Sequence, residues 1–350
     1  LVDRLRLDLS RIEGMAGGLR QVASLRDPVG EITEGWVRPN GLRIEKVRVP
    51  LGVVAIIYES RPNVTSDAFG LCLKSGNVAF LRGSSSAISS NLAISAVLRE
   101  ALPKAGLPAD ALVLVDDITR EAAIEFMQQR GYVDCLIPRG GHALIQSILE
   151  NATVPYVIDG AGNCHIYVDA AADLAMARNI LVNAKTQRTG VCNAAESLVV
   201  HVDVAAEFIP MAVDALADVE LVGDDAAQGL ASSIGVATDD DFATEFLDMK
   251  MSVKVVDTLD EAIAHINDTT TGHSEAIITG NIAAADRFIR EVDAAAVLVN
   301  ASTRFVDGEE FGFGAEIGIS TQKLHARGPM GLSELTTQKY IVRGEGHIRP

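Results

Sequence analysis

The stretch VVAIIYESRPN, residues 53–63, decides the fold class of this chain. Its first six residues are apolar without alternation and rich in β-branched side chains, which is typical of a strand buried on both faces. A helical stretch at 64–74 follows, and a second apolar run, VAFL, occupies residues 78–81. Short buried strands that alternate with helices predict βαβ units and therefore a parallel sheet.

The same pattern recurs in two series along the chain. The first series predicts strands at 53–58, 78–81, 111–115 and 133–137, separated by helices at 64–74, 86–102 and 119–129. The second series predicts strands at 164–168, 197–202, 252–256, 275–278 and 296–299, with amphipathic helices at 202–216 and 257–267. Because 350 residues exceed what one compact core usually serves, we expect two α/β domains with parallel sheets.

The parts outside these two series are a predicted N-terminal helix at 1–24 and a ribbon. Segment 34–50, EGWVRPNGLRIEKVRVP, contains Asn40-Gly41, a strong hairpin signal. Its arms are too polar to be stable alone, and the tail LTTQKYIVRG at 335–344 again alternates like a strand. We therefore expect the ribbon to pack against another element or another subunit.

Composition limits the classes of partner. A formal net charge of −17 argues against non-specific binding to nucleic acid or membranes, and no apolar run approaches the roughly 18 residues of a membrane helix. Four cysteines without a CxxC pair and seven histidines without a close pair predict reduced thiols in the cytosol and no metal site. The opening LVDRLRLDLSR has no signal-peptide core and no initiator Met, so we expect that some N-terminal sequence is missing.

Parallel sheets bind ligands beyond the carboxyl ends of their strands, which singles out the loops ESRPN (59–63), RGSSS (82–86) and PRGG (138–141). In the last two, an arginine and glycines precede a helix, so a fixed charge, an approachable backbone and a helix N-terminus could hold a phosphate. An ordinary strand-to-helix turn explains these residues equally well, and there is no GxGxxG fingerprint. Asn63 could donate its amide to an oxyanion, although the local sequence favours a helix cap.

The loop QRTGVCNAAE, residues 187–196, places Cys192 among polar residues before the apolar run SLVVHV. A thiol is a nucleophile only as the thiolate, and the nearby Lys185 and Arg188 could favour that form. Cysteine is also a small apolar residue that is usually buried and inert. The local sequence leaves both interpretations open for Cys192. The inert interpretation is favoured for the other cysteines, Cys72, Cys135 and Cys164.

A glycine-rich segment, NASTRFVDGEEFGFGAEIG at 300–318, follows the last predicted strand. Such a segment beside a sheet is either a substrate loop or only a connection. His273, within TTTGHSE, could belong to a pocket, but a position in a surface loop fits its polar neighbours better.

Taken in order, these loops resemble those of one family. The segments are PLGVVAIIYESRPNV (50–64), SGNVAFLRG (75–83), DCLIPRGG (134–141), AKTQRTGVCNAAE (184–196), NASTRF (300–305), FGFGAEIGIS (311–320) and HARGPMGL (325–332). They resemble the aldehyde dehydrogenase superfamily and, within it, the branch that reduces glutamyl 5-phosphate. The likeness runs from residue 50 to near the C-terminus.

This resemblance implies three structural parts. Residues 1–34 and 51–160 would form a nucleotide-binding domain, and residues 161–320 a catalytic domain with the nucleophilic cysteine. Strands at 35–50 and 335–346 would form a small oligomerisation element, and the N-terminus would be shorter than in the family. The resemblance also implies a cytoplasmic homo-oligomer, and it suggests a functional association with glutamate 5-kinase.

The resemblance further implies roles for individual residues. Cys192 matches the nucleophile, and Asn63 matches the oxyanion donor, which reverses the local preference for a cap. The cofactor residues implied are Arg82, Gly83, Arg139, Gly140, Gly141 and Glu245, of which Arg82 stands where the superfamily has a lysine beside the adenosine ribose and Glu245 would contact the nicotinamide ribose. The substrate residues expected are Arg61, Ser302, Arg304 and Asp307.

One departure from the superfamily concerns VIDGAGN, residues 157–163. Hydrolytic aldehyde dehydrogenases carry a glutamate base in the matching segment, and here there is none, although Asp159 lies close. The implied activity is therefore reduction, with NADPH, of L-glutamyl 5-phosphate to L-glutamate 5-semialdehyde and phosphate through a cysteine thioester, as in the second step of proline biosynthesis. Alternatives are an acylating relative that uses another acyl phosphate or a coenzyme A thioester, and a scaffold without catalysis.

Overall fold

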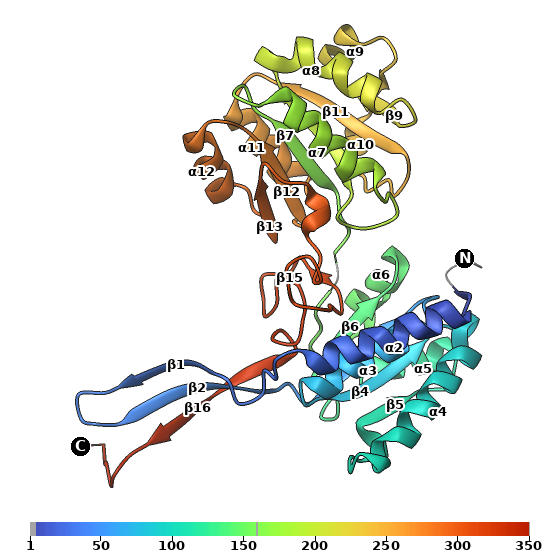
Figure 1. The fold of residues 1–350 in the computed structure, drawn as a ribbon, viewed down its shortest axis with the longest axis vertical. Coiled ribbons are helices and arrows are strands. Elements are labelled where there is room, and N and C mark those ends of the chain that lie inside the picture. Colours follow the sequence, from blue (N-terminus) through green and yellow to red (C-terminus); the bar gives the residue numbers. More distant parts are fainter. Residues whose placement is uncertain (1–4, 159, 350) are drawn as a thin grey trace. The chain divides into compact units, whose positions relative to one another are not determined.

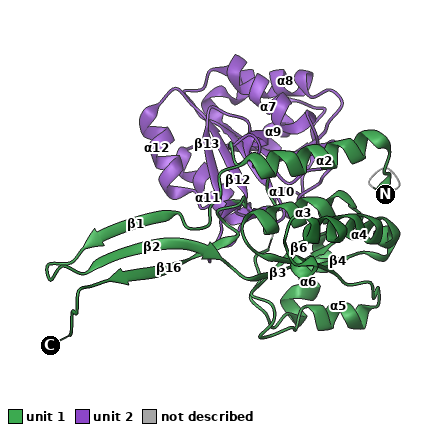
Figure 2. Cartoon of the chain, turned by 60° about the horizontal axis from the view of Figure 1, so that its bottom comes forward, with its two compact units in different colours: residues 1–159, 312–318, 329–350 green, residues 160–311, 319–328 purple. Residues whose placement is uncertain are grey.

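The computed structural model describes residues 5–158 and 160–349. The chain divides into two compact units (Figure 2). Unit 1 comprises residues 1–159, 312–318 and 329–350, and unit 2 comprises residues 160–311 and 319–328. Residues 312–318, which the sequence places in the catalytic domain, thus belong to unit 1.

Unit 1 is built on a four-stranded parallel sheet in the order β5-β4-β3-β6. Its strands are β3 (Val53–Tyr58), β4 (Val78–Gly83), β5 (Leu112–Leu114) and β6 (Cys135–Arg139). The connecting helices are α3 (Asn63–Lys74), α4 (Ile88–Lys104), α5 (Arg120–Phe126) and α6 (His142–Asn151). Ala55 and Ile57 pack with Phe126 on one face, while Val54 and Ile56, which alternate with them along the strand, are also buried. The absence of alternation in β3 is therefore the result of burial on both faces.

The predicted N-terminal helix is shorter than expected. Helix α2 (Leu9–Ser24) begins after Asp8, whose carboxylate accepts the Arg11 N–H at 3.0 Å. Residues 1–4 of the predicted helix lie outside the described part of the chain. None of the described helices is both long enough and apolar enough to span a bilayer.

A three-stranded antiparallel ribbon extends from the rest of unit 1 (Figure 1). It consists of β1 (Ile32–Val37), β2 (Arg43–Pro50) and β16 (Thr336–Arg343), in the order β1-β2-β16. The hairpin predicted at Asn40-Gly41 is confirmed, with Gly41 at φ 93° and its N–H donating to the Arg38 carbonyl at 2.9 Å. The C-terminal strand supplies the third member that the polar hairpin lacked by itself.

Unit 2 contains a seven-stranded sheet in which every pair is parallel, in the order β10-β9-β11-β8-β7-β12-β13. Its strands are β7 (Cys164–Val168), β8 (Ala195–His201), β9 (Glu220–Gly223), β10 (Gly235–Val236), β11 (Lys250–Val256), β12 (Ser274–Ile278) and β13 (Ala296–Val299). Successive residues of β7 belong to the two hydrophobic clusters that lie on opposite faces of the sheet. Ile166 and Val168 pack toward α7 (Leu174–Thr186) and α8 (Val202–Ala215), whereas Tyr167 packs toward α11 (Leu259–Thr269) and α12 (Ile282–Glu291).

The remaining elements of the chain are short. They are α9 (Asp225–Leu230), α10 (Asp239–Phe242), the 3-10 turns η1 (Ser85–Ala87), η2 (Ala109–Ala111) and η3 (Thr303–Phe305), and the paired strands β14 (Ile319–Ser320) and β15 (Gly328–Pro329).

Candidate functional site

Cys192 lies in the loop between α7 and β8. Of the four cysteines, all within the described residues, Cys192 is half-buried and the others are buried. Burial raises the pKa of the Cys135 thiol to about 12 and raises that of Cys164 well above its ordinary value. Cys192 is therefore the least buried of the four cysteines, and burial favours the inert interpretation for the other three.

The turn at residues 302–306 holds the residue that follows Cys192. The Thr303 hydroxyl donates to the Asn193 carbonyl at 2.7 Å, and the Asn193 amide donates to the Val306 carbonyl at 2.9 Å. The Arg304 guanidinium donates to the side-chain oxygen of Asn193. Asn193 is only 4% exposed, so these bonds fix a buried anchor directly beside Cys192.

Two of the expected substrate residues have partners within this turn or directly after it. Ser302 is buried, and its hydroxyl accepts the Arg304 N–H at 3.3 Å. Asp307 is half-buried, and its carboxylate accepts the Glu309 N–H at 2.9 Å. The NASTRF segment is therefore part of the structure around Cys192.

The segment before β7 forms the other side of this loop. The Cys164 thiol donates to the Cys192 carbonyl at 3.2 Å. A Cβ placed on Gly162 would lie 1.5 Å from the Cys192 carbonyl oxygen, so only glycine fits there. The Gly162 N–H donates to the Glu245 carboxylate at 2.7 Å, which brings this expected cofactor residue next to the nucleophile loop.

A buried ion pair closes the stem of the loop. Lys185 is the last residue but one of α7, and Glu196 is the second residue of β8. The Lys185 Nζ and Glu196 Oε2 atoms lie 2.5 Å apart, and both side chains are fully buried. Burial raises the pKa of Glu196 to about 7 and lowers that of Lys185, and the ion pair opposes both shifts. The expectation that Lys185 acts on Cys192 is therefore corrected, because Glu196 matches its charge. Arg188 is exposed.

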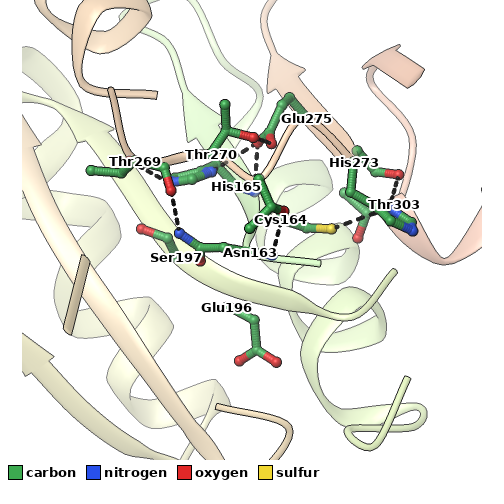
Figure 3. Close-up of polar contacts among 12 residues, drawn as sticks. Asn163, Cys164, His165, Glu196, Ser197, Thr269, Thr270, His273, Glu275 and Thr303 are labelled. Atoms are coloured by element: carbon green, nitrogen blue, oxygen red, sulfur yellow. Dashed lines mark hydrogen bonds and ion pairs between the residues drawn. The ribbon is translucent and has the colours of Figure 1, made fainter. Parts of the chain in front are cut away.

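A buried polar cluster lies behind Cys164 (Figure 3). His165 Nδ1 lies 2.9 Å from the Glu275 carboxylate, and the Asn163 amide donates to the Thr269 carbonyl at 2.9 Å. His273 is fully buried, with Nδ1 at 2.8 Å from the Ser274 hydroxyl, so its expected surface position is wrong. Within residues 5–158 and 160–349, no three His, Cys, Asp or Glu side chains are grouped as metal ligands.

His273 predicts a pH dependence of stability. Burial lowers its pKa from 6.5 to about 4, so between these pH values the folded chain binds fewer protons than the unfolded chain. This contribution to the free energy of unfolding is fully present above pH 6.5. It is lost, by up to about 3 kcal/mol, as the pH falls from 6.5 toward the lowered pKa of about 4. In urea unfolding, His273→Gln should lose less stability over this range than the parent chain. Equal losses in both proteins would contradict the assignment.

In unit 1, Asn63 is the first residue of α3. The N-cap is Pro62, so the cap role favoured by the local sequence is not observed. The Asn63 amide is exposed and donates to the Asp67 carboxylate at 2.9 Å. Burial raises the pKa of Asp67, while Asn63, Ser66 and Arg139 oppose the shift.

The three loops at the carboxyl edge of the unit 1 sheet lie together. The Ser60 N–H donates to the Ser84 hydroxyl at 3.2 Å, and Glu59 Oε2 accepts the Gly141 N–H at 3.0 Å. A Cβ on Gly140 would lie 2.8 Å from the Glu59 carboxyl group. The Glu59 carboxylate thus already occupies the start of α6 and would compete with a phosphate there, which no local sequence pattern predicts.

Arg82 is buried beside this edge. One guanidinium nitrogen donates to the Thr119 carbonyl at 2.6 Å, while the Nε atom is buried without a hydrogen-bond partner among the described residues. Burial lowers the pKa of Arg82, with Asp117 opposing. An unsatisfied buried donor is costly, so this N–H suits a ligand that accepts a hydrogen bond. Arg61 is exposed and Arg139 half-buried.

Sequence reasoning missed where the contacts of the Cys192 loop come from. The carboxyl-edge rule directs attention to loops that follow strands, whereas the Cys192 loop precedes β8 and Gly162 precedes β7. The only sequence feature that marks Gly162 and Cys164 is the run of small residues in GAGNC (160–164). Nothing in that local pattern connects the run with position 192.

Comparison with known proteins gives a consistent result. The aldehyde dehydrogenase family model matches residues 9–245 and 251–341. Gamma-glutamyl phosphate reductases from Heliobacterium modesticaldum and Caldanaerobacter subterraneus are 60% and 56% identical to this chain. Both matches cover all of this chain, and they cover 84% and 85% of the two relatives, respectively. The chain in a crystal structure of gamma-glutamyl phosphate reductase from Thermotoga maritima is 51% identical to this chain. The match covers all of this chain and 85% of the Thermotoga maritima chain, with a TM-score of 0.98.

These matches confirm the predicted fold class and the resemblance. The shared fold follows from the superposition, and the identity extends over the whole chain rather than over isolated motifs. Membership of the family indicates an oxidoreductase that acts on an aldehyde and uses a nicotinamide cofactor. The chain belongs to the aldehyde dehydrogenase family and, within it, to the gamma-glutamyl phosphate reductases.

Proposed function

We propose that this chain reduces L-glutamyl 5-phosphate to L-glutamate 5-semialdehyde and phosphate with NADPH, the second step of proline biosynthesis. The observation that carries the proposal is Cys192, the least buried cysteine, in a loop fixed by the turn at 302–306 and by Gly162. Relatives that are 56% and 60% identical bear the name of this activity, which supports the choice of substrate.

The chemistry assigned to the chain is covalent catalysis. The Cys192 thiolate attacks the γ-carbonyl carbon, and the carbonyl electron pair moves to oxygen. The Asn63 amide and the Cys192 N–H donate hydrogen bonds to this oxyanion. The electron pair on the oxyanion then re-forms the carbonyl, and the bond from the carbonyl carbon to the phosphate oxygen breaks. Phosphate leaves, and a thioester remains on Cys192. After reduction, the carbon–sulfur bond breaks and the sulfur regains its electron pair.

NADPH supplies the hydride that reduces the thioester. The residues proposed to hold it are Arg82, Gly83, Arg139, Gly140, Gly141 and Glu245. The buried Arg82 Nε without a described partner supports a hydrogen-bond acceptor at this position. Glu59 at the Gly141 N–H favours a ribose hydroxyl there over a phosphate, because a carboxylate accepts from the former and repels the latter.

The charged groups of the substrate require matching side chains. Arg61, Ser302 and Arg304 are proposed for the phosphate and carboxylate groups, and Asp307 for the ammonium group. The ribbon of β1, β2 and β16 is proposed as the oligomerisation element of a homo-oligomer, with unit 1 as the nucleotide-binding domain and unit 2 as the catalytic domain. The four free cysteines support a cytoplasmic location, and association with glutamate 5-kinase remains a further proposal.

The reverse reaction tests the function and separates it from its alternatives. Glutamate 5-semialdehyde, phosphate and NADP⁺ should yield NADPH, followed by absorbance, and omission of phosphate should stop the reaction. The absence of glutamate from VIDGAGN supports this requirement, since no base is supplied for hydrolysis of the thioester. Asp159 in this segment lies outside the described residues. An equal rate with coenzyme A in place of phosphate would favour the acylating alternative, and no turnover at all would favour the scaffold.

A further inference from the structure

Arg304 connects the two ends of the loop that carries Cys192. Its Nε donates to the Gln187 side chain at 2.9 Å, and Gln187 is the first residue after α7. Its Nη1 donates to the Asn193 side-chain oxygen, and Asn193 immediately follows the cysteine. Both acceptors belong to the seven residues 187–193, so one planar guanidinium spans the loop.

The orientation of the Asn193 amide is fixed independently. Its nitrogen donates to the Val306 carbonyl at 2.9 Å, which leaves the oxygen as the group that faces Arg304. The Thr303 hydroxyl adds a bond to the Asn193 main chain at 2.7 Å. Three residues of one turn, Thr303, Arg304 and Val306, therefore form hydrogen bonds with Asn193, the residue beside Cys192. Of the three, Arg304 is the one that carries a charge.

Arg304 and Cys192 also interact electrostatically. Burial and then Arg188 lower the pKa of Arg304, while Asp307, Cys192 and Glu310 oppose this shift. The interaction is mutual, so a cation that is favoured by the charged sulfur also favours the thiolate. Half-burial of Arg304 limits screening by solvent.

We infer that Arg304 is a positioning residue for Cys192, which fixes the loop around the sulfur and supplies the positive charge that favours its thiolate. The inference rests on the proposed role of Cys192 as the nucleophile. For Arg304 it replaces the substrate-binding role proposed above, because both contacts of the guanidinium go to the loop that carries Cys192.

The test is alkylation of Cys192 by iodoacetamide across a pH series in the free enzyme, read by mass spectrometry of the modified peptide. The reagent is neutral and no substrate is present, so an arginine that only binds substrate leaves the profile unchanged. Arg304→Met should move the midpoint of the profile up by about one pH unit and slow alkylation at neutral pH about tenfold. Arg188→Met, which removes an exposed charge from the same loop, should move the midpoint by less than about a third of that shift.

Arg304→Lys separates the charge from the geometry. A lysine keeps the positive charge but cannot span two acceptors, so the midpoint should stay near that of the parent while kcat falls about tenfold and KM for glutamyl phosphate changes little. Circular dichroism checks the fold of each variant. If Arg304→Met does not fold, Gln187→Leu at an exposed position keeps the charge, removes one acceptor and should lower kcat at an unchanged midpoint.

An unchanged midpoint in Arg304→Met, or an equal shift in Arg188→Met, would overturn the inference. A raised KM for glutamyl phosphate with unaltered alkylation in Arg304→Lys would instead assign Arg304 to substrate binding. Because alkylation needs no substrate, a shifted profile in an enzyme that does not turn over glutamyl phosphate would reject the proposed function alone. Normal turnover with no shift would reject the inference alone.

Discussion

Cys192→Ala is expected to abolish the reduction of glutamyl 5-phosphate, with a fall in kcat of at least about ten-thousandfold, because no thioester can form without the sulfur. The described contacts that hold the loop use the Cys192 carbonyl and the neighbouring Asn193, and alanine keeps the backbone. The variant should therefore fold as the parent chain does. The measurements are NADPH consumption, thermal unfolding and NADPH binding.

Alkylation provides the control for this variant. Under native conditions iodoacetamide should label the parent chain at one cysteine and Cys192→Ala at none, since the other three thiols are buried. Cys72→Ala is the matched variant, because it removes a fully buried sulfur from α3 and should keep its turnover at a cost in stability of about 1 kcal/mol. More than about one per cent residual activity in Cys192→Ala would reject thioester catalysis.

The central strands could be predicted from the sequence because burial on both faces leaves a continuous apolar run. The bounds of β3, β7 and β13 agree with prediction to the residue. Strands β9 and β10 were not predicted. Strand β9 has four residues, and β10 has two exposed residues at the edge of the sheet. Strands of this length carry too little apolar pattern to be recognised.

Cys192 could be singled out from the sequence as a candidate nucleophile, but its surroundings could not be predicted. Cys192 stands out locally as a thiol in a polar loop, whereas Thr303 and Val306 reach Asn193 across more than a hundred residues of sequence. His273 shows the opposite error. Its neighbours are polar, but it directly precedes β12 and enters the core with that strand. Such contacts depend on tertiary packing, which no local window contains.

Gly162→Ala is expected to reduce kcat by about a thousandfold although the Cys192 side chain itself is unchanged. The added Cβ would lie 1.5 Å from the Cys192 carbonyl oxygen, whereas such contacts essentially never fall below 3.0 Å. The obstructing atoms are backbone, so the loop itself must move by more than an ångström, and a displacement of 1 Å at a reacting group can cost about a hundredfold in rate. The Cys164 bond to the same carbonyl would be lost as well. Steady-state kinetics and the rate of Cys192 alkylation measure the effect.

Gly229→Ala is the matched control, because it makes the same chemical change in unit 2, in helix α9, where no atom lies within 4 Å of the new Cβ. It should retain the parent rate and the parent unfolding temperature, since alanine favours a helix over glycine. If both variants kept the parent rate, the backbone of Cys192 could shift without consequence, and the close contact with Gly162 would have no part in placing the sulfur. If Gly162→Ala alone lost activity while Cys192 still reacted with iodoacetamide, position rather than reactivity would be the quantity that this glycine controls.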